Sequence, residues 1–173
     1  MKLSDFDFHL PAAAIAQHPL EPRDAARMLV VGDTLADRSV RDLPALLAPG
    51  DLLVCNDTKV IPVRLAGRRG DAAIEATLIE DLGDGRWRAM AKPGRRLRSG
   101  QRIKFADDFA AEVFAKNADG TVELAFGLGG PELLAALATH GQMPLPPYIK
   151  RPREGEARDH ADYQTIFAAR PGA

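Results

Sequence analysis

Between residues 67 and 126 the chain alternates apolar and polar side chains in short segments that are separated by turns, and this pattern constrains the fold most. Ala73–Ile79 and Arg86–Ala91 alternate on either side of the turn Gly83-Asp84-Gly85. Further strands are predicted at Arg102–Phe105, Ala111–Ala115 and Thr121–Phe126. Strands that recur roughly every 8–12 residues with such turns between them favour a small barrel or sandwich.

The flanking segments are mixed in character. A helix is predicted at Pro131–His140, because proline suits the first helical turn and Gly141 can end the helix. Short helices are predicted at Pro11–Gln17 and Leu43–Ala48. Strands are predicted at Ala26–Val31, at the apolar run Leu52–Cys55 and at Val60–Ala66, which Pro62 interrupts.

Composition excludes several classes of protein. The 173 residues are 46% hydrophobic and carry 23 basic and 24 acidic side chains, unlike a disordered tail. Every apolar run falls far short of the roughly 20 residues that a membrane span needs. Met1–Leu10 contains two aspartates where a secretory leader would be apolar, and Cys55 is a single cysteine. We therefore expect a cytoplasmic protein without a membrane partner, a disulfide or a cysteine-based metal site.

A basic segment stands out in this neutral chain. Between Arg86 and Lys104 lie eight Lys and Arg residues and no acid. Such a concentration of charge is the electrostatic footprint of a protein that binds a polyanion. The alternative is that these side chains are solvated outward positions on strands, bridged to nearby acids.

Three loop segments carry clusters of polar residues that suit ligand contact. They are His18–Arg27, which includes Arg23 and Asp24; Asn56-Asp57-Thr58; and Tyr148-Ile149-Lys150-Arg151 followed by Tyr163-Gln164-Thr165. Each has a plainer interpretation, respectively a surface loop with a local salt bridge, a turn or helix cap, and a rigid connector. The four histidines are isolated and do not have metal-ligand spacing.

In this order, the polar segments resemble the S-adenosylmethionine:tRNA ribosyltransferase-isomerase family of queuosine biosynthesis, the QueA family. The matching stretches run from end to end of the chain. They are Phe6-Asp7-Phe8 with Leu10-Pro11; 15–24 with Arg27; 49–62 with Arg64 and Leu65; Lys92-Pro93-Gly94; 141–149; and Asp162-Tyr163-Gln164-Thr165. Each stretch alone is a weak signal, but the combination is specific.

The resemblance implies an α/β domain, incomplete in this chain, with an inserted all-β antiparallel barrel. Residues 1–62 and 140–173 would be parts of a discontinuous α/β catalytic domain, and residues 63–139 would form the barrel and a trailing helix. The family's chains are about twice as long, so we interpret this sequence as the amino-terminal portion of such a protein. We expect the full-length protein to be a monomer and this portion to self-associate and to lack full activity.

The implied reaction moves the ribosyl group of S-adenosylmethionine onto 7-aminomethyl-7-deazaguanine in a tRNA with a GUN anticodon, giving epoxyqueuosine, without a metal. The resemblance makes His18, Asp24 and Asp57 the candidates for catalysis. Candidates for binding cofactor or substrate are Arg23, Arg27, Asn56, Thr58, Arg64, Tyr148, Lys150, Arg151, Tyr163, Gln164 and Thr165. The tRNA backbone would contact Arg86, Arg88, Lys92, Arg95, Arg96 and Arg98. The alternative function is a non-catalytic RNA-binding β-barrel module.

Overall fold

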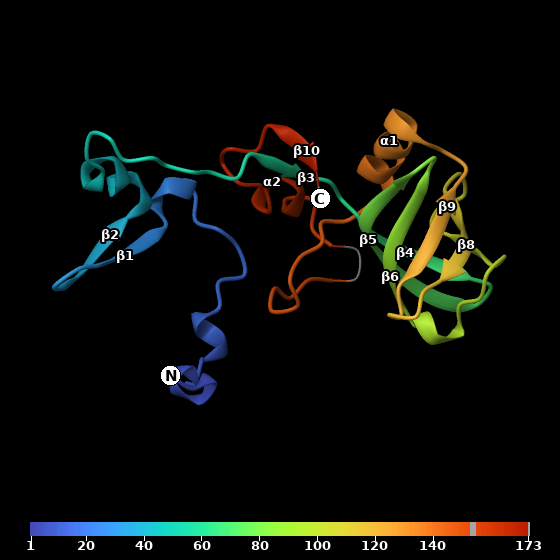
Figure 1. Cartoon of the computed structure of the whole chain (residues 1–173), viewed down its shortest axis with the longest axis horizontal. Coiled ribbons are helices and arrows are strands. Elements are labelled where there is room, and N and C mark those ends of the chain that lie inside the picture. Colours follow the sequence, from blue (N-terminus) through green and yellow to red (C-terminus); the bar gives the residue numbers. More distant parts are fainter. Residues whose placement is uncertain (153–154, 173) are drawn as a thin grey trace. The chain divides into compact units, whose positions relative to one another are not determined.

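The computed structural model describes residues 1–152 and 155–172 (Figure 1). The chain forms two compact units. The first contains Met1–Cys55 and Pro146–Arg151, and the second contains Asn56–Leu145 and the described residues from Pro152 onward. The domain boundaries expected near residues 62 and 139 remain a prediction.

The first unit is built from short elements. Three 3-10 helices, η1 (Leu3–Phe6), η2 (Ala12–Ala14) and η3 (Arg23–Ala25), precede an antiparallel hairpin of β1 (Arg27–Val31) and β2 (Leu35–Ser39). The 3-10 helix η4 (Val40–Leu46) follows, and the Asp42 carboxylate accepts hydrogen bonds from Ser39 N–H and Oγ at 2.9 Å each. The strand predicted at Ala26–Val31 is confirmed. The two predicted helices are short 3-10 helices, and Pro44 lies inside η4.

The buried strand predicted at Leu52–Cys55 is wrong. These residues form no strand, and Leu52 and Val54 are 88% and 84% exposed. The sequence signal was the apolar run itself, but a strand also needs a neighbour that supplies backbone partners and covers its side chains. Among the described residues, no strand pairs with this segment.

The second unit contains a closed antiparallel barrel, as the alternating segments predicted. In order around the barrel, the strands are β4 (Arg64–Arg69), β5 (Ala72–Gly83), β6 (Arg86–Lys92), β9 (Val122–Phe126), β8 (Ala110–Lys116) and β7 (Arg102–Lys104). Side chains alternate between the buried interior and the exposed wall, as in Val122–Phe126, where Val122, Leu124 and Phe126 are buried. The tight turn at Gly85 requires glycine, because its φ is +71° and a Cβ there would collide with the Leu128 carbonyl.

The helix α1 (Gly130–His140) packs against the barrel core through buried Leu133 and Leu137. At the start of this helix Pro131 occupies the first turn, and at its end the Gly141 N–H donates to Leu137 O at 2.8 Å. A Cβ at Gly141 would collide with the Pro62 carbonyl, so the sequence ends the helix with glycine because of close packing rather than a positive φ. The His140 ring stacks on Phe109 with centroids 5.4 Å apart.

A two-stranded parallel sheet accompanies the barrel in the second unit. It pairs β3 (Thr58–Val60) with β10 (Arg170–Gly172), and the short helix α2 (Asp159–Asp162) precedes β10. The strand predicted across Val60–Ala66 is therefore two strands, β3 and β4, which are separated at Pro62 as the missing proline N–H requires. The barrel together with this parallel pair confirms the predicted fold class.

Candidate functional site

In the first unit, the side chain of Gln17 joins two polar segments that the sequence had singled out separately. Its Oε1 accepts from the Lys150 N–H at 2.7 Å, and its Nε2 donates to the Tyr148 carbonyl at 3.2 Å. Its own carbonyl accepts from Arg151 Nη2 at 2.8 Å. We call Gln17, His18, Tyr148, Lys150 and Arg151 the Gln17 clamp. The clamp joins the backbone that carries Tyr148, Lys150 and Arg151 to the backbone that carries His18.

The contact between Arg151 and His18 fixes the imidazole tautomer. Arg151 Nη2 lies 3.2 Å from His18 Nδ1. A guanidinium group only donates, so Nδ1 accepts and the ring proton lies on Nε2. His18 is exposed, and Nε2 is the donor atom of its ring.

The other predicted residues of the first unit make ion pairs with different partners. Asp24 pairs with Arg41 at 3.4 Å, and Arg27 pairs across the β1–β2 hairpin with Asp37 at 3.4 Å. The side chain of Arg27 is 85% exposed. Arg23 is half-buried in η3. Surface pairs of this kind contribute about 0–1 kcal/mol each, so they orient side chains more than they stabilise the fold.

In the second unit, the turn before β3 meets the segment that leads to β10. The Asp57 carbonyl accepts from the N–H groups of Ala169 and Arg170 at 2.8 and 3.1 Å, and its carboxylate lies 3.4 Å from Arg170 Nε. Gln164 spans the same two segments, because its Oε1 accepts from Val60 N–H at 2.8 Å and its Nε2 donates to Val60 O at 2.9 Å. These contacts give Gln164 a positioning role.

The remaining predicted residues of this unit support the same junction. Asn56 Oδ1 accepts from Thr58 N–H at 2.8 Å, which forms the turn that begins β3. Thr165 Oγ1 accepts from Phe167 N–H at 3.3 Å. Tyr163 is half-buried and follows α2, where its N–H donates to Asp159 O at 3.0 Å. The structure therefore brings together the Asn56–Thr58 turn and the Tyr163–Thr165 segment.

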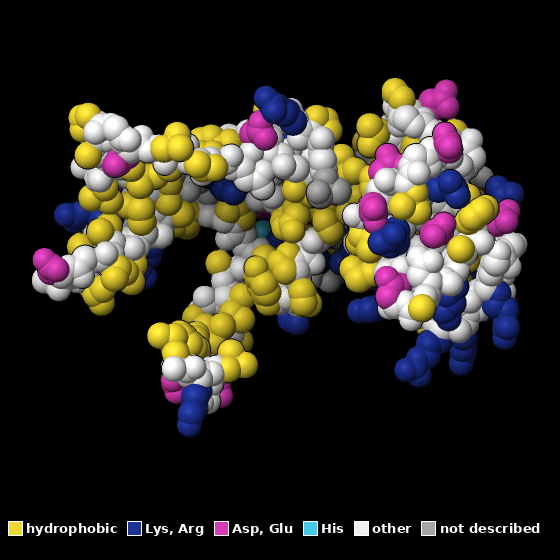
Figure 2. All heavy atoms as spheres, viewed as in Figure 1, with side chains coloured by type: hydrophobic (Ala, Val, Ile, Leu, Met, Phe, Trp, Pro, Cys, Tyr) yellow, Lys and Arg dark blue, Asp and Glu magenta, His cyan; other side chains and the backbone are white. Residues whose placement is uncertain are grey.

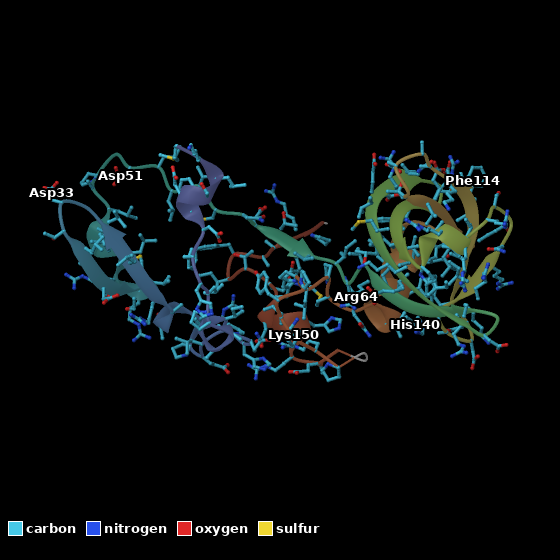
Figure 3. All side chains as sticks on the ribbon, turned by 90° about the horizontal axis from the view of Figure 1, so that it is seen from below. Asp33, Asp51, Arg64, Phe114, His140 and Lys150 are labelled. Carbon is cyan, nitrogen blue, oxygen red and sulfur yellow. The ribbon has the colours of Figure 1, made fainter. Side chains whose placement is uncertain are left out.

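Arg64 begins the barrel rather than joining these loops (Figure 3). Its Nη2 lies 2.8 Å from Glu75 Oε2, and both side chains are partly exposed. Its backbone pairs with Gln142 in both directions, at 3.1 and 2.8 Å. Binding of a ligand by Arg64 stays a prediction, while its structural contact joins the two ends of the barrel segment.

Seven of the eight residues of the basic segment divide into two groups, and the eighth, Arg102, is exposed on β7 opposite Glu112. Arg88 is bridged to Glu80 at 3.0 Å, and the guanidinium of Arg86 covers the Phe114 ring at 5.1 Å. Lys104 lies 2.7 Å from Asp107, and this hydrogen bond lowers the pKa of the Asp107 carboxyl, so the pair is neutralised. For Arg88 and Lys104 the alternative of outward positions bridged to nearby acids is correct, whereas Arg86 contacts an aromatic ring.

The other group projects from one end of the barrel. Lys92, Arg95, Arg96 and Arg98 are exposed, and none of them forms an ion pair with an acid in the described part of the chain. Figure 2 shows Lys and Arg side chains gathered at the lower end of the barrel, where Figure 1 places the 3-10 helix η5 (Gly94–Arg96). We call these four residues the basic tip.

Side chains from β8 and β4 hold the backbone of the basic tip by hydrogen bonds. Lys116 Nζ donates to the carbonyls of Gly94 and Arg95 at 3.3 Å each, and Arg69 Nη1 donates to the Arg96 carbonyl at 2.9 Å. Buried Leu97 anchors the same turn in the barrel core. The arginine side chains therefore project from a fixed backbone, which lowers the entropy lost when they bind.

Among the residues that the structure describes, no three His, Cys, Asp or Glu side chains are grouped to hold a metal ion. No helix within the described ranges has the length and apolar character needed to span a bilayer.

Comparison with known proteins identifies the family. The profile of queuosine biosynthesis proteins matches residues 3–173. This chain belongs to the queuosine biosynthesis protein family. The resemblance seen in the sequence motifs is thereby confirmed.

Several members of the queuosine biosynthesis family are similar to the whole chain. An S-adenosylmethionine:tRNA ribosyltransferase-isomerase from Caulobacter sp. (strain K31) is 52% identical over 194 residues, covering 100% of this chain and 52% of the relative. One of the same name from Rhodospirillum rubrum is 51% identical, covering 100% of this chain and 50% of the relative. The chain spans about half the length of the curated relatives it matches.

A solved structure of this family is also similar. The crystal structure of S-adenosylmethionine tRNA ribosyltransferase from Thermotoga maritima at 2.00 Å is 37% identical, covering 81% of this chain and 56% of that chain, with a TM-score of 0.37.

Sequence reasoning on this queuosine biosynthesis chain missed the residues that organise the candidate sites. Gln17 lies within a matching stretch, but nothing in the stretch indicated that it contacts Lys150, which is 133 residues away. Lys116 and Arg69 lie outside the basic segment that drew attention. The only sequence signal for Gln17 was its position directly before His18 in a proline-rich loop.

Proposed function

We propose that this chain is part of an enzyme that transfers the ribosyl group of S-adenosylmethionine to tRNA and isomerises it. The acceptor is the amine of 7-aminomethyl-7-deazaguanine in a GUN anticodon, and the product is epoxyqueuosine. The amine nitrogen gains a bond to the transferred sugar, while the sugar loses its bonds to adenine and to the methionine sulfur. The observation that carries this proposal is the family match over residues 3–173.

We assign His18 to hydrogen-bond or proton donation. Its Nδ1 accepts from Arg151, so the ring proton lies on Nε2 and that nitrogen acts as a donor. Departure of adenine leaves negative charge on the base, and a positioned donor stabilises that charge in the transition state. This geometry favours His18 as a donor to the leaving base over His18 as the base that removes a ribose proton.

We assign the cations of the Gln17 clamp to anion binding. Lys150 and Arg151 sit on one backbone segment that Gln17 fixes. The methionine carboxylate of the donor and the phosphates of tRNA are the anions of this reaction, and Arg is suited to bidentate contact with either. Tyr148 is 55% exposed beside them and offers a ring on which a base can stack.

The carboxylates are assigned to proton abstraction or hydroxyl binding. The positive sulfonium acidifies the neighbouring ribose carbon, so a carboxylate can serve as the base. Asp57 and Asp24 each lie 3.4 Å from an arginine nitrogen, of Arg170 and Arg41 respectively. We propose both as candidates, with Asn56 and Thr58 as hydrogen-bonding neighbours of Asp57.

The partner is tRNA, and we propose that the basic tip contacts its backbone. Arginines without acidic partners on a held turn suit phosphate contacts, and these contacts carry affinity without sequence preference. We propose a cytoplasmic location for the protein, because its proposed partner is tRNA. We also propose that residues 1–62 and 140–173 belong to a discontinuous catalytic domain.

We propose that this chain self-associates. Leu52 and Val54 are exposed apolar side chains, and they support this proposal.

Titration calorimetry and a product assay test the function together. S-adenosylmethionine and, separately, tRNA carrying the aminomethyl base are titrated into the chain, with the full-length Caulobacter relative as the positive control. In the relative, adenine and methionine are expected in equal amounts and only with modified tRNA. The chain is expected to bind both ligands. If it binds neither while the relative binds both, the proposal is wrong.

A second candidate function has its own observation. The barrel is a closed unit with a held basic tip, so it can bind RNA without catalysis. In the same experiment this alternative predicts binding of tRNA, modified or not, with no heat from S-adenosylmethionine. Binding of S-adenosylmethionine to the chain would contradict it.

A further inference from the structure

An exposed aromatic ring stands on the outer wall of the barrel. Phe114 is 50% exposed, and it lies on β8 where the register with β9 shifts between Val113 and Ala115. Phe114 is the extra residue of this β-bulge, and bulges redirect a side chain relative to regular pleating. Figure 3 shows Phe114 on the outer side of the barrel.

The ring carries a cation on one face. The Arg86 guanidinium carbon lies 5.1 Å from the ring centroid, a cation–π distance. Stacked Phe and Arg groups present two flat surfaces, and unpaired RNA bases stack on both kinds of surface. Core packing does not account for the ring, because half of its surface remains accessible.

Hydrogen bonds connect Phe114 to the basic tip. Ser99 Oγ donates to the Phe114 carbonyl at 2.7 Å, and Gly100 N–H donates to the Val113 carbonyl at 2.9 Å. Ser99 directly follows Arg98 of the tip, and Lys116, two residues beyond Phe114, holds the Gly94 and Arg95 carbonyls. Phe114 and the arginines of the basic tip therefore lie on two segments that hydrogen bonds join to each other.

We propose that Phe114, with Arg86 over it, is a stacking platform for one unpaired RNA base whose neighbouring phosphates lie on the basic tip. The inference rests on the proposed function only in taking RNA as the partner. A double helix would not use the ring, because its bases are already stacked. The occupant is therefore a single-stranded segment or loop.

The charges around the platform set the direction of the strand. Glu112 and Glu123 are further outward positions on β8 and β9, and Glu80 is paired with Arg88. Glu112 lies opposite Arg102 and Glu123 lies opposite Arg88 in the register, so the cations without acidic neighbours lie at the tip, and the tip attracts the phosphates. The backbone of the RNA therefore runs from the platform toward Arg98 rather than across the strands.

Binding of two RNA probes to the full 173-residue chain tests the platform. One probe is a twelve-nucleotide oligouridylate, and the other is an abasic oligonucleotide of equal length, which keeps the phosphates and lacks the bases. Fluorescence anisotropy measures both affinities. Phe114→Leu should weaken binding of the oligouridylate by about tenfold and leave the abasic probe unchanged. Phe114→Tyr should retain the wild-type affinity for both.

Matched variants separate stacking from charge and from unfolding. Phe8→Leu makes the same exchange at a ring that is 74% exposed in the other unit, and should change neither affinity. Arg95→Glu with Arg96→Glu should weaken both probes. Thermal melting of Phe114→Leu, followed by circular dichroism, checks that the variant is folded, and the tyrosine variant tests the ring if it is not.

The outcomes are distinct from those of the proposed function. If Phe114→Leu weakens both probes equally or neither probe, the platform is refuted and Phe114 is a surface partner of Arg86. Absence of oligouridylate binding by the wild-type chain also refutes it. Neither result affects the binding of S-adenosylmethionine, on which the proposed function depends.

Discussion

The side-chain amide of Gln164 pairs with both backbone groups of Val60, accepting from its N–H at 2.8 Å and donating to its carbonyl at 2.9 Å. An amide used in this way replaces a neighbouring strand at that position of β3. The two residues are 104 positions apart, so the contact holds a distant segment beside the Asp57 turn.

Replacing Gln164 should loosen this junction without unfolding the barrel. Gln164→Leu leaves two partly buried backbone groups without their partner, at a cost of about 1–3 kcal/mol for each. Gln164→Glu retains an acceptor for the N–H but loses the donor for the carbonyl, so its effect should be intermediate. Hydrogen exchange of the Val60, Ala169 and Arg170 amides measures how far the junction is loosened in the wild type and in each of the two variants. Equal protection in all three proteins would contradict the prediction.

Replacing Gln17 should release the Lys150 segment. Gln17→Leu removes the acceptor of the Lys150 N–H, and a lost hydrogen bond of about 1 kcal/mol corresponds to roughly fivefold faster local exchange. Nitrogen NMR of His18 should then show a mixture of ring tautomers, because Arg151 is less constrained. Gln101→Leu, which removes a glutamine in the barrel, is the control and should leave the His18 signals unchanged.

Asp119 should make the barrel sensitive to acid. Its carboxylate accepts from Thr121 Oγ1 at 2.7 Å and Thr121 N–H at 2.9 Å, and these bonds hold the pKa of Asp119 below its ordinary value of 3.8. Because the folded pKa is the lower one, the stabilisation is complete above pH 3.8 and is lost as the pH falls through the folded pKa.

The test compares Asp119→Asn with the wild type by urea unfolding, using fluorescence of the single tryptophan, buried Trp87. The variant should be less stable at pH 7, and the difference should shrink as the pH falls below 3.8. Asp71→Asn, at another exposed turn of the barrel, is the matched control. A difference for Asp119→Asn that does not change with pH would refute the assignment.

Phe109 should be a major contributor to barrel stability. It is 2% exposed, and its ring lies 5.3 Å from Phe126 and 5.4 Å from His140, centroid to centroid. Phe109→Ala should lower the free energy of unfolding by about 3–5 kcal/mol, because it leaves a cavity where α1 packs. Phe167→Ala, at a ring that is 50% exposed in the same unit, should change it by less than about 0.5 kcal/mol.

Charge reversal at the basic tip should change the salt dependence of tRNA binding. Arg95→Glu with Arg96→Glu removes two of the proposed phosphate contacts, so the slope of log affinity against log salt should fall by about 2. Lys2→Glu with Arg38→Glu changes the net charge equally in the other unit and is the control. An unchanged slope in the tip variant would show that tRNA does not contact these arginines.

Most of the barrel could be predicted because residues that are adjacent in the sequence specify its strands and turns. Alternation along Val122–Phe126 and glycine turns such as Gly85 are properties of adjacent residues. β10 was missed because Arg170-Pro171-Gly172 has no strand pattern and becomes a strand only through pairing with β3. Leu52–Cys55 failed for the converse reason, since its apolar run has no strand partner among the described residues.

The candidate sites were predictable as segments and not as contacts. Family motifs indicated the loop at His18 and the segment at Lys150, but the geometry that joins them depends on the side chain of Gln17. In the basic segment, charge alone could not separate Arg88, which has an acidic partner, from Arg95 and Arg96. That separation depends on which strand lies next to which, a property of the closed barrel.

Because the backbones of Arg64 and Gln142 are paired, the chain enters and leaves the barrel segment at adjacent points. The segment between these two residues is an insertion whose ends are hydrogen-bonded to each other. Its length and content can therefore diverge without altering the separation that the neighbouring segments have to bridge. A barrel inserted in this way can be replaced or enlarged during evolution. Protein engineers can also transplant it into another protein.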